Sequence, residues 1–219
     1  MHNTIKNLLD IKNNIKFYLE KLNINSNPKI LAVSKTFEIN KILPLIEYGH
    51  LHYGENKVQE ALEKWSDIKI TKKDLKLHLI GKLQTNKVKQ AIKIFDYIHS
   101  VDSERLAKKI ADEEIKQGKK IKIFIQVNIG NEEQKSGVNK SSVYELYSYC
   151  KAINLNVIGL MCIPPLTKSS DIYFKEMNIL NKNLNLNELS MGMSSDYLDA
   201  IKNSATYERI GSNIFGQRS

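Results

Sequence analysis

Hydrophobic residues recur along the chain in two patterns, and each pattern predicts one kind of element. Residues 4–22 have the period of an amphipathic helix. The apolar positions of this segment are Ile5, Leu8, Leu9, Ile15, Leu19 and Leu22. Asn25-Ser26-Asn27-Pro28 ends the helix. From there the chain alternates short apolar runs with segments of helical spacing, which predicts alternating strands and helices.

The short apolar runs predict eight strands. They are Ile30–Ser34, Leu51–Gly54, Lys76–Gly81, Tyr97–Val101, Ile121–Val127, Asn156–Met161, Glu188–Met191 and Tyr207–Gly211. The segments between them predict helices near 38–48, 56–65, 86–93, 103–117, 141–152, 170–183 and 195–203, with a short helix after 213. A strand followed by a helix, many times over, is typical of a parallel sheet.

Eight such repeats favour a (β/α)8 TIM barrel with an extra N-terminal helix. A doubly wound open sheet is the alternative. No linker rich in Pro, Gly or Ser and no abrupt change of composition divides the chain. We therefore expect residues 1–219 to form a single barrel domain.

In a barrel of this kind, function lies at the C-terminal ends of the strands. The predicted strand ends carry Lys35, Thr36, Glu55, Asn56, Gly81, Asp102, Asn128, Cys162, Met193, Ser194, Arg209, Gly211 and Ser212. This set has no metal-ligand spacing, no nucleophile elbow and no glycine-rich phosphate loop of the dinucleotide or P-loop type. It offers instead one lysine, amides, hydroxyls and an arginine.

Lys35 closes the apolar run Ile30–Ser34 and has two interpretations. The simpler one is the solvated end of a strand. The functional one is a lysine that forms a Schiff base, because an amine among apolar walls has a lowered pKa and can attack an aldehyde. The spacing alone leaves both open.

The segment from Arg209 to Gly216 predicts a phosphate site. Gly211 permits close approach to the backbone just before a short helix, whose first N–H groups suit an anion. The loop with Ser194 and Ser195 follows the preceding strand, and barrels often bind phosphate after strands seven and eight. Capping of the next helix is the structural alternative for Ser194 and Ser195.

The other polar residues have structural interpretations. Asn56 is expected as a helix N-cap, as is Asp102 or Ser103. His78 lies between Leu77 and Leu79 and is expected in the core. His50, His52 and His99 show no partner spacing, and Trp65 is expected to pack.

The charge and the cysteine content of the chain limit the kinds of function that it can have. There are 33 basic and 24 acidic residues, so the formal net charge is +9, but only Arg105, Arg209 and Arg218 are arginines. Lysines spread along the whole chain indicate a solvated surface rather than a nucleic-acid interface. Cys150 and Cys162 form no CxxC pair, and we find no apolar span or signal peptide. We expect a cytoplasmic protein without membrane or nucleic-acid partners.

Several stretches of the chain resemble stretches of one protein family, and they follow one another in the same order as in that family. They are Leu31–Thr36, Tyr53–Glu60, His78–Lys87, Gln126–Ile129, Gly159–Met161, Leu189–Ser194, Arg209–Gly211 and Ile214–Gly216. The chain resembles the pyridoxal phosphate homeostasis proteins, the YggS/PROSC family. It departs from them at Leu77, where a Trp is common, and at Ser204, where Gly is usual.

The resemblance implies a barrel like the alanine racemase N-terminal domain, with pyridoxal 5'-phosphate held as a Schiff base on Lys35. It further implies Ser194, Gly211 and Ser212 around the phosphate, Asn56 near the ring and Arg209 near the pyridine nitrogen. An arginine there favours an unprotonated nitrogen and a weak electron sink.

The expected function is therefore a carrier or regulator in vitamin B6 homeostasis, with indirect effects on amino-acid metabolism and no catalytic residues or metal. Because the sequence ends at Ser219, directly after the barrel, we expect no dimer-building domain that would supply a second base. A small racemase dependent on pyridoxal phosphate is the alternative. Expected partners are the cofactor and apo-enzymes that use it, and we expect a monomer.

Overall fold

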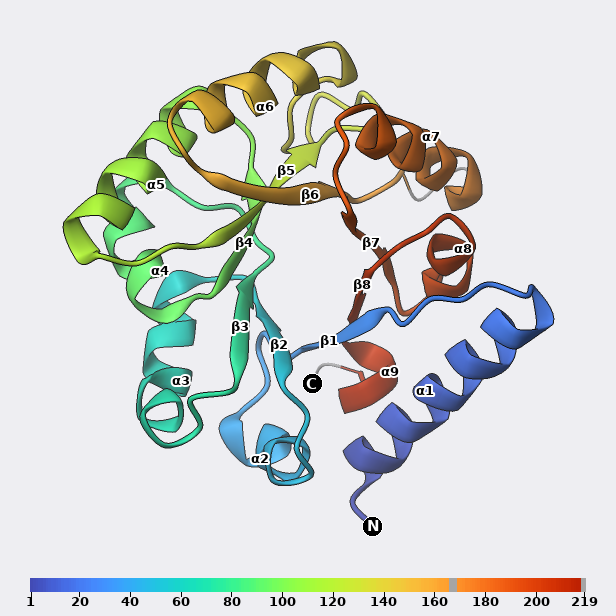
Figure 1. Cartoon of the computed structure of the whole chain (residues 1–219). Helices are drawn as coiled ribbons and strands as arrows, with labels where there is room; N and C mark the ends of the chain where they lie inside the picture. The colour runs from blue at the N-terminus through green and yellow to red at the C-terminus, as the bar shows by residue number, and fades with distance from the viewer. Residues whose placement is uncertain (166–168, 218–219) are drawn as a thin grey trace.

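The computed structural model describes residues 1–165 and 169–217 (Figure 1). In this part of the chain, parallel strands close into a barrel in the order β1 to β8. The strands are β1 (Lys29–Val33), β2 (His52–Glu55), β3 (Lys76–Leu79), β4 (Tyr97–Val101), β5 (Lys122–Val127), β6 (Asn156–Cys162), β7 (Glu188–Met193) and β8 (Tyr207–Ile210). The predicted TIM barrel is confirmed, and the open-sheet alternative is wrong because β8 pairs with β1.

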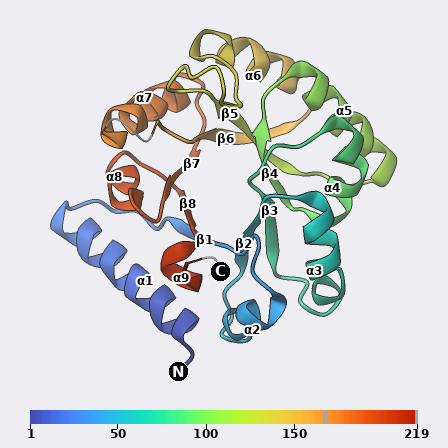
Figure 2. The same cartoon turned by 180° about the vertical axis from the view of Figure 1, so that it is seen from behind.

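Helices cover the outside of the barrel, as Figure 1 and the reverse view in Figure 2 show. They are α1 (Asn3–Lys21), α2 (Ile39–Glu47), α3 (Val58–Thr71), α4 (Val88–Ile94), α5 (Glu104–Gln117), α6 (Val143–Ala152), α7 (Ser170–Asn183), α8 (Tyr197–Lys202) and α9 (Ser212–Phe215), with 3-10 turns η1 (Thr85–Lys87) and η2 (Lys140–Ser142). The extra N-terminal helix is thus confirmed. It packs on α9, where Asn7 donates a 2.9 Å hydrogen bond to the Ile214 carbonyl.

Strand and helix boundaries follow the hydrophobic pattern closely, with one clear exception. The spacing predicts a helix over 56–65, but α3 continues to Thr71. Trp65 is fully buried, and Ile68 packs against the core one turn further on. The side chain of Lys69 donates to the Ile94 carbonyl at the end of α4. Tertiary contacts therefore hold the last turns that a single apolar stripe did not indicate.

The core has two layers. Most apolar side chains lie between the strands and the surrounding helices. A smaller cluster fills the barrel interior, and its members are Leu31, Tyr97, Phe124, Met161 and Tyr207. Polar side chains of β3, β4 and β7 share this interior, because residues of a strand alternate between its two faces.

Within residues 1–165 and 169–217, no helix is long and apolar enough to span a membrane. The same residues contain no group of three or more His, Cys, Asp or Glu that could hold a metal ion. Cys150 and Cys162 are buried and not disulfide-bonded.

Glu208 of β8 is buried on the outer face of the barrel, toward α8. A Cβ on Gly192 would overlap its carboxyl group, and Ala200 and Tyr197 of α8 are the next neighbours of that position. In the described part of the chain, neither carboxyl oxygen has a hydrogen-bond partner. Burial raises the pKa of Glu208 well above its ordinary value, with Arg209 opposing the shift. Burial therefore favours the protonated form of this carboxyl.

We expect Glu208→Leu to raise the free energy of unfolding at neutral pH by about 1–3 kcal/mol, because it removes an unsatisfied buried polar group. The folded pKa lies above the unfolded one, so the wild type loses stability as pH rises from about 4.3 toward the folded pKa. The gain should therefore grow with pH across that window. Denaturant unfolding at several pH values measures it.

Glu114→Leu is the matched control. Glu114 is also buried, but its carboxylate accepts a 2.6 Å bond from the Ile121 N–H and pairs with Lys120 at 3.0 Å. Its replacement should lower the stability. A Glu208→Leu protein that is no more stable than the wild type at any pH would contradict our account of this carboxyl.

Candidate functional site

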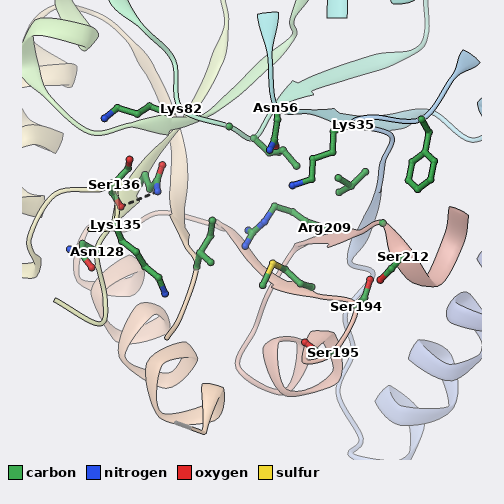
Figure 3. A pocket seen from close by; sticks show the side chains of 18 of the residues that line it. Lys35, Asn56, Lys82, Asn128, Lys135, Ser136, Ser194, Ser195, Arg209 and Ser212 are labelled. Carbon is green, nitrogen blue, oxygen red and sulfur yellow. Dashed lines mark hydrogen bonds between the residues drawn. The ribbon is translucent and has the colours of Figure 1, made fainter. Parts of the chain in front are cut away.

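A cavity of about 620 Å³ opens at the C-terminal ends of the strands. It has the size of a small-molecule site. Figure 3 shows Lys35 and Asn56 on one side, Arg209 in the centre, Ser194 with Ser212 at one end, and Lys82 with Lys135 at the other. All six residues expected to bind the cofactor line this one cavity. They are Lys35, Asn56, Ser194, Arg209, Gly211 and Ser212.

The cavity is electropositive. Among the described residues that line it, Lys35, Lys82, Lys135 and Arg209 are basic and none is acidic. Cations gathered in a concave wall concentrate an anionic ligand there. The site therefore suits a ligand that carries a phosphate or another anion.

Lys35 sits in a turn directly after β1 and is half-buried. The strand holds one side of this turn, because the Ser34 N–H donates a 3.0 Å bond to the Gly54 carbonyl of β2. Thr36 on the other side has a φ of 69°, in the left-handed region. This sharp turn directs the Lys35 side chain into the cavity (Figure 3).

A network of charged side chains, which we call the clamp, connects this turn to α3 and consists of Glu55, Glu60 and Lys64. The Lys64 ammonium of α3 donates to the Ser34 carbonyl at 2.9 Å and to Glu55 and Glu60 at 3.0 Å each. Glu60 accepts the Thr36 N–H at 2.6 Å. The backbone on both sides of Lys35 is thus tied to α3, which fixes the origin of the lysine side chain.

Glu55 is the buried anchor of this clamp. Its Oε1 accepts from Ser34 Oγ at 2.7 Å, from Trp65 Nε1 at 2.9 Å and from Lys64. Burial raises the pKa of Glu55, and Lys64, Trp65 and Ser34 counteract the rise. Burial also tends to raise the pKa of Glu60, but the hydrogen bonds from the Thr36 N–H and from Lys64 outweigh this effect, so the pKa of Glu60 is lowered.

Arg209 projects from β8 into the floor of the cavity and is 5% exposed. Its Nη1 donates to Ser190 Oγ and its Nη2 to the Cys162 carbonyl, both at 2.8 Å. Burial lowers the pKa of Arg209 from its very high ordinary value. The guanidinium is therefore held in one orientation by neutral acceptors on β6 and β7.

Two adjacent turns form the end of the cavity that carries the hydroxyl groups. Ser194 follows β7, where the Met193 N–H donates a 2.7 Å bond to Asp196 Oδ1. The Asn213 amide of α9 donates to the Ser194 carbonyl at 2.9 Å, which joins the two turns. A Cβ on Gly211 would lie 3.3 Å from the Val33 carbonyl oxygen, so the backbone here passes close to β1.

The N-caps of α3, α5 and α8 decide between the alternatives for several residues. The N-cap of α3 is Lys57, so the expectation of Asn56 as N-cap is wrong; its carbonyl instead lies against Gly81. The N-cap of α8 is Asp196, so capping by Ser194 or Ser195 is also wrong. Ser103 caps α5, as expected, through a 3.4 Å bond from the Leu106 N–H.

Two basic residues of the cavity wall were not identified from the sequence. Lys82 and Lys135 line the cavity, but only Lys82 has a signal, because it follows the predicted end of β3. His52 and His99 show no partner spacing in the sequence, yet both take part in a hydrogen-bonded chain through the buried His78. His78 is in the core as expected, with Tyr97 stacked on it at 4.1 Å.

Three comparisons with known proteins agree on the relatives of the chain. The family model described as the alanine racemase N-terminal domain matches residues 7–219. The chain is 40% identical over 200 residues to the pyridoxal phosphate homeostasis protein of Aquifex aeolicus (strain VF5), with 87% of each chain covered. The human protein of the same name is 35% identical over 211 residues, which cover 87% of this chain and 77% of the human one.

Solved structures show the same relationship. PipY of Synechococcus elongatus PCC7942 with pyridoxal phosphate (PLP) bound is 31% identical, has a TM-score of 0.80, and covers 92% of this chain with 100% of its own. The alanine racemase of Clostridium difficile 630 is 18% identical with a TM-score of 0.76, and this chain covers 57% of it. At that identity the likeness is one of fold alone.

Proposed function

This chain belongs to the pyridoxal phosphate homeostasis proteins and carries the alanine racemase N-terminal domain, and from this membership we propose that it binds pyridoxal 5'-phosphate in the cavity described above and acts in vitamin B6 homeostasis. One observation supports the location best: a lysine, a buried arginine and two hydroxyl-bearing turns line a single electropositive cavity. The donor set fits the cofactor, which has an aldehyde, a ring nitrogen and a phosphate.

When bound, the cofactor supplies an aldehyde that forms a reversible covalent bond with a primary amine. In the proposal Lys35 provides that amine. The clamp of Glu55, Glu60 and Lys64 fixes the backbone from which the Lys35 side chain extends. A fixed origin reduces the conformational entropy that the lysine must lose on binding.

Ser194, Gly211 and Ser212 would hold the phosphate. The two serine hydroxyls can donate, and the first N–H groups of α9 have no partner inside their own helix. A Cβ on Gly211 would be in tight contact with Val33, so a larger side chain there would press against β1. Asn56 would lie near the ring, opposite this end (Figure 3).

Arg209 would lie near the pyridine nitrogen. It carries a fixed positive charge and can only donate, so it favours an unprotonated ring nitrogen and weak stabilisation of a carbanion. This supports a carrier or regulator over an enzyme. The rival is a small amino-acid racemase with weak activity, and the fold alone does not decide between the two.

The proposal extends to the setting of the protein. The recipients of the cofactor would be apo-enzymes that depend on it, and the chain would act as a cytoplasmic monomer with residues 1–219 as one barrel unit. Size-exclusion chromatography with light scattering tests the monomer, and transfer of the cofactor to a purified apo-enzyme tests the carrier role.

Retention of cofactor tests the site, and turnover tests the rival. After incubation with PLP and desalting, the protein should retain close to one equivalent, whereas pyridoxal, which lacks the phosphate, should be retained far less. Single-enantiomer alanine should keep its configuration in a chiral assay. Equal retention of both aldehydes would contradict the binding of the phosphate by Ser194, Gly211 and Ser212. Sustained racemisation that depends on Lys35 would replace the proposed carrier by a racemase.

A further inference from the structure

A chain of hydrogen bonds crosses the barrel interior and ends at Arg209. His52 Nδ1 lies 3.0 Å from His78 Nε2, and His78 Nδ1 lies 2.9 Å from His99 Nε2. His99 Nδ1 lies 2.8 Å from Ser190 Oγ, which in turn accepts from Arg209 Nη1 at 2.8 Å. The other four members of this chain, His52, His78, His99 and Ser190, come from different strands, β2, β3, β4 and β7.

The chain connects the two ends of the barrel. His52 begins β2 and lines a cleft between α1 and the N-terminal ends of the strands. Arg209 lines the cavity at the opposite end. His78, His99 and Ser190 between them have 1% exposure or less, so water does not compete for these bonds.

The three imidazoles are neutral. Burial lowers the pKa of His52 to about 4, with Lys29 and Lys76 adding to the effect. Burial also lowers the pKa of His78 and His99 well below the ordinary value. A neutral imidazole has one donor and one acceptor nitrogen, so the chain must run in one direction.

Arg209 sets that direction. A guanidinium can only donate, so Ser190 Oγ accepts from it, and the proton of this buried hydroxyl is then satisfied by donation to His99 Nδ1. His99 then donates from Nε2 to His78, and His78 donates from Nε2 to His52. Every group along the chain points its acceptor atom toward Arg209.

This orientation matters because Arg209 is a buried cation whose hydrogen bonds end on neutral oxygens. Burial raises the pKa of the neighbouring Glu208 carboxyl well above its ordinary value, which reduces the negative charge that it offers to Arg209. Aligned neutral dipoles can stabilise a charge in a low-dielectric interior without placing a second charge there.

We propose that Ser190, His99, His78 and His52 act as positioning residues for Arg209 and hold its guanidinium at the ring end of the cofactor. They also stabilise its positive charge, because each residue of the chain donates its hydrogen bond in the direction away from Arg209. This inference rests on the proposed function, since it assigns Arg209 to the cofactor ring. It also extends the site across the barrel to a residue of the opposite end.

Other titratable and charged groups surround the chain. Tyr97 stacks on His78, and Tyr207 lies edge-on to His99 at 6.0 Å. Lys29 and Lys122 lie over the Tyr207 and Tyr97 rings, and Asp96 acts on His52 from the N-terminal end. A useful test must therefore remove hydrogen bonds of the chain and leave these rings in place.

Ser190→Ala removes the bond to Arg209 and the bond to His99 in one step. We expect the variant to bind PLP about tenfold more weakly, the effect of losing one charge-assisted hydrogen bond, and to shift the absorption band of the bound cofactor. Ser190→Thr keeps the hydroxyl and should restore both. Ser100→Ala is the matched control, because Ser100 is equally buried on β4 and its hydroxyl has no hydrogen-bond partner among the described residues.

Nitrogen-15 NMR of the cofactor-free wild type gives a second, independent result. We expect His52, His78 and His99 to be neutral and protonated on Nε2. Protonation on Nδ1, or a Ser190→Ala protein that matches Ser100→Ala in affinity and absorption band, would overturn the inference. A wild type that takes up no PLP would overturn the proposed function, and with it the role of Arg209 at the ring, whatever the imidazoles show.

Discussion

Replacing Lys35 with alanine is expected to abolish the covalent capture of pyridoxal phosphate and to weaken its binding on the order of 100-fold, the equivalent of about 2.7 kcal/mol. The reason is that Lys35 is the amine placed within the cavity by the turn after β1 (Figure 3). Binding that remains would come from the phosphate end and Arg209. The measurement is a titration with PLP, followed by absorbance and by the amount retained after desalting.

Two further variants separate covalent capture from charge. Lys35→Arg keeps the positive charge but offers no amine of the same reactivity, so we expect weak binding without a covalent adduct. Lys29→Ala is the control, because Lys29 lies at the opposite end of β1 and pairs with Glu188 at 3.4 Å. Full retention of cofactor by Lys35→Ala would show that another group captures it.

The second large effect is expected from Lys64→Met. The Lys64 side chain is 9% exposed, and its ammonium pairs at 3.0 Å with Glu55, whose side chain is fully buried. Removing one partner of a buried ion pair leaves the other uncompensated and costs about 3–5 kcal/mol. The turn around Lys35 also loses its bond from Lys64 to the Ser34 carbonyl. Both the free energy of unfolding and the uptake of PLP should therefore fall.

The pH dependence of the stability of Lys64→Met shows whether the loss of stability comes from the uncompensated Glu55. Without Lys64 the pKa of Glu55 rises further, and the carboxyl then takes up a proton as pH falls. The deficit in stability should therefore be smaller at acidic than at alkaline pH, and Lys64→Met combined with Glu55→Gln should recover part of it. Lys108→Met, which removes an exposed pair with Asp112, should leave stability nearly unchanged. A deficit independent of pH would contradict the account of Glu55.

The barrel and most of the site could be predicted from sequence because both depend on local pattern. Buried parallel strands appear as short apolar runs, and the residues that follow each run meet at one end of the barrel. Lys35, Ser194 and Arg209 are far apart in sequence, yet each stands at a strand end or just after it. The extent of α3 was less predictable, since its last turns depend on contacts with α4.

The clamp and the histidine chain could not be predicted, because both depend on how separate elements pack against one another. The pairing of Glu55 with Lys64 had no signal, because it needs α3 to pack against the turn after β1. His99 and Ser190 are 91 residues apart and meet only across the closed barrel. Strand alternation places such residues on the inner face, but the partner on a distant strand depends on the register between strands. Lys135 lies in a loop after β5, with no periodicity to indicate its place in the cavity.

The most direct test of the central claim is to trap the cofactor and locate it. The purified protein, incubated with PLP, is reduced with borohydride, digested and mapped by peptide mass. Our account predicts a visible band that disappears on reduction and one pyridoxyl group on Lys35. A band that never forms, or a pyridoxyl group found on Lys82, Lys135 or surface lysines instead of Lys35, would contradict it.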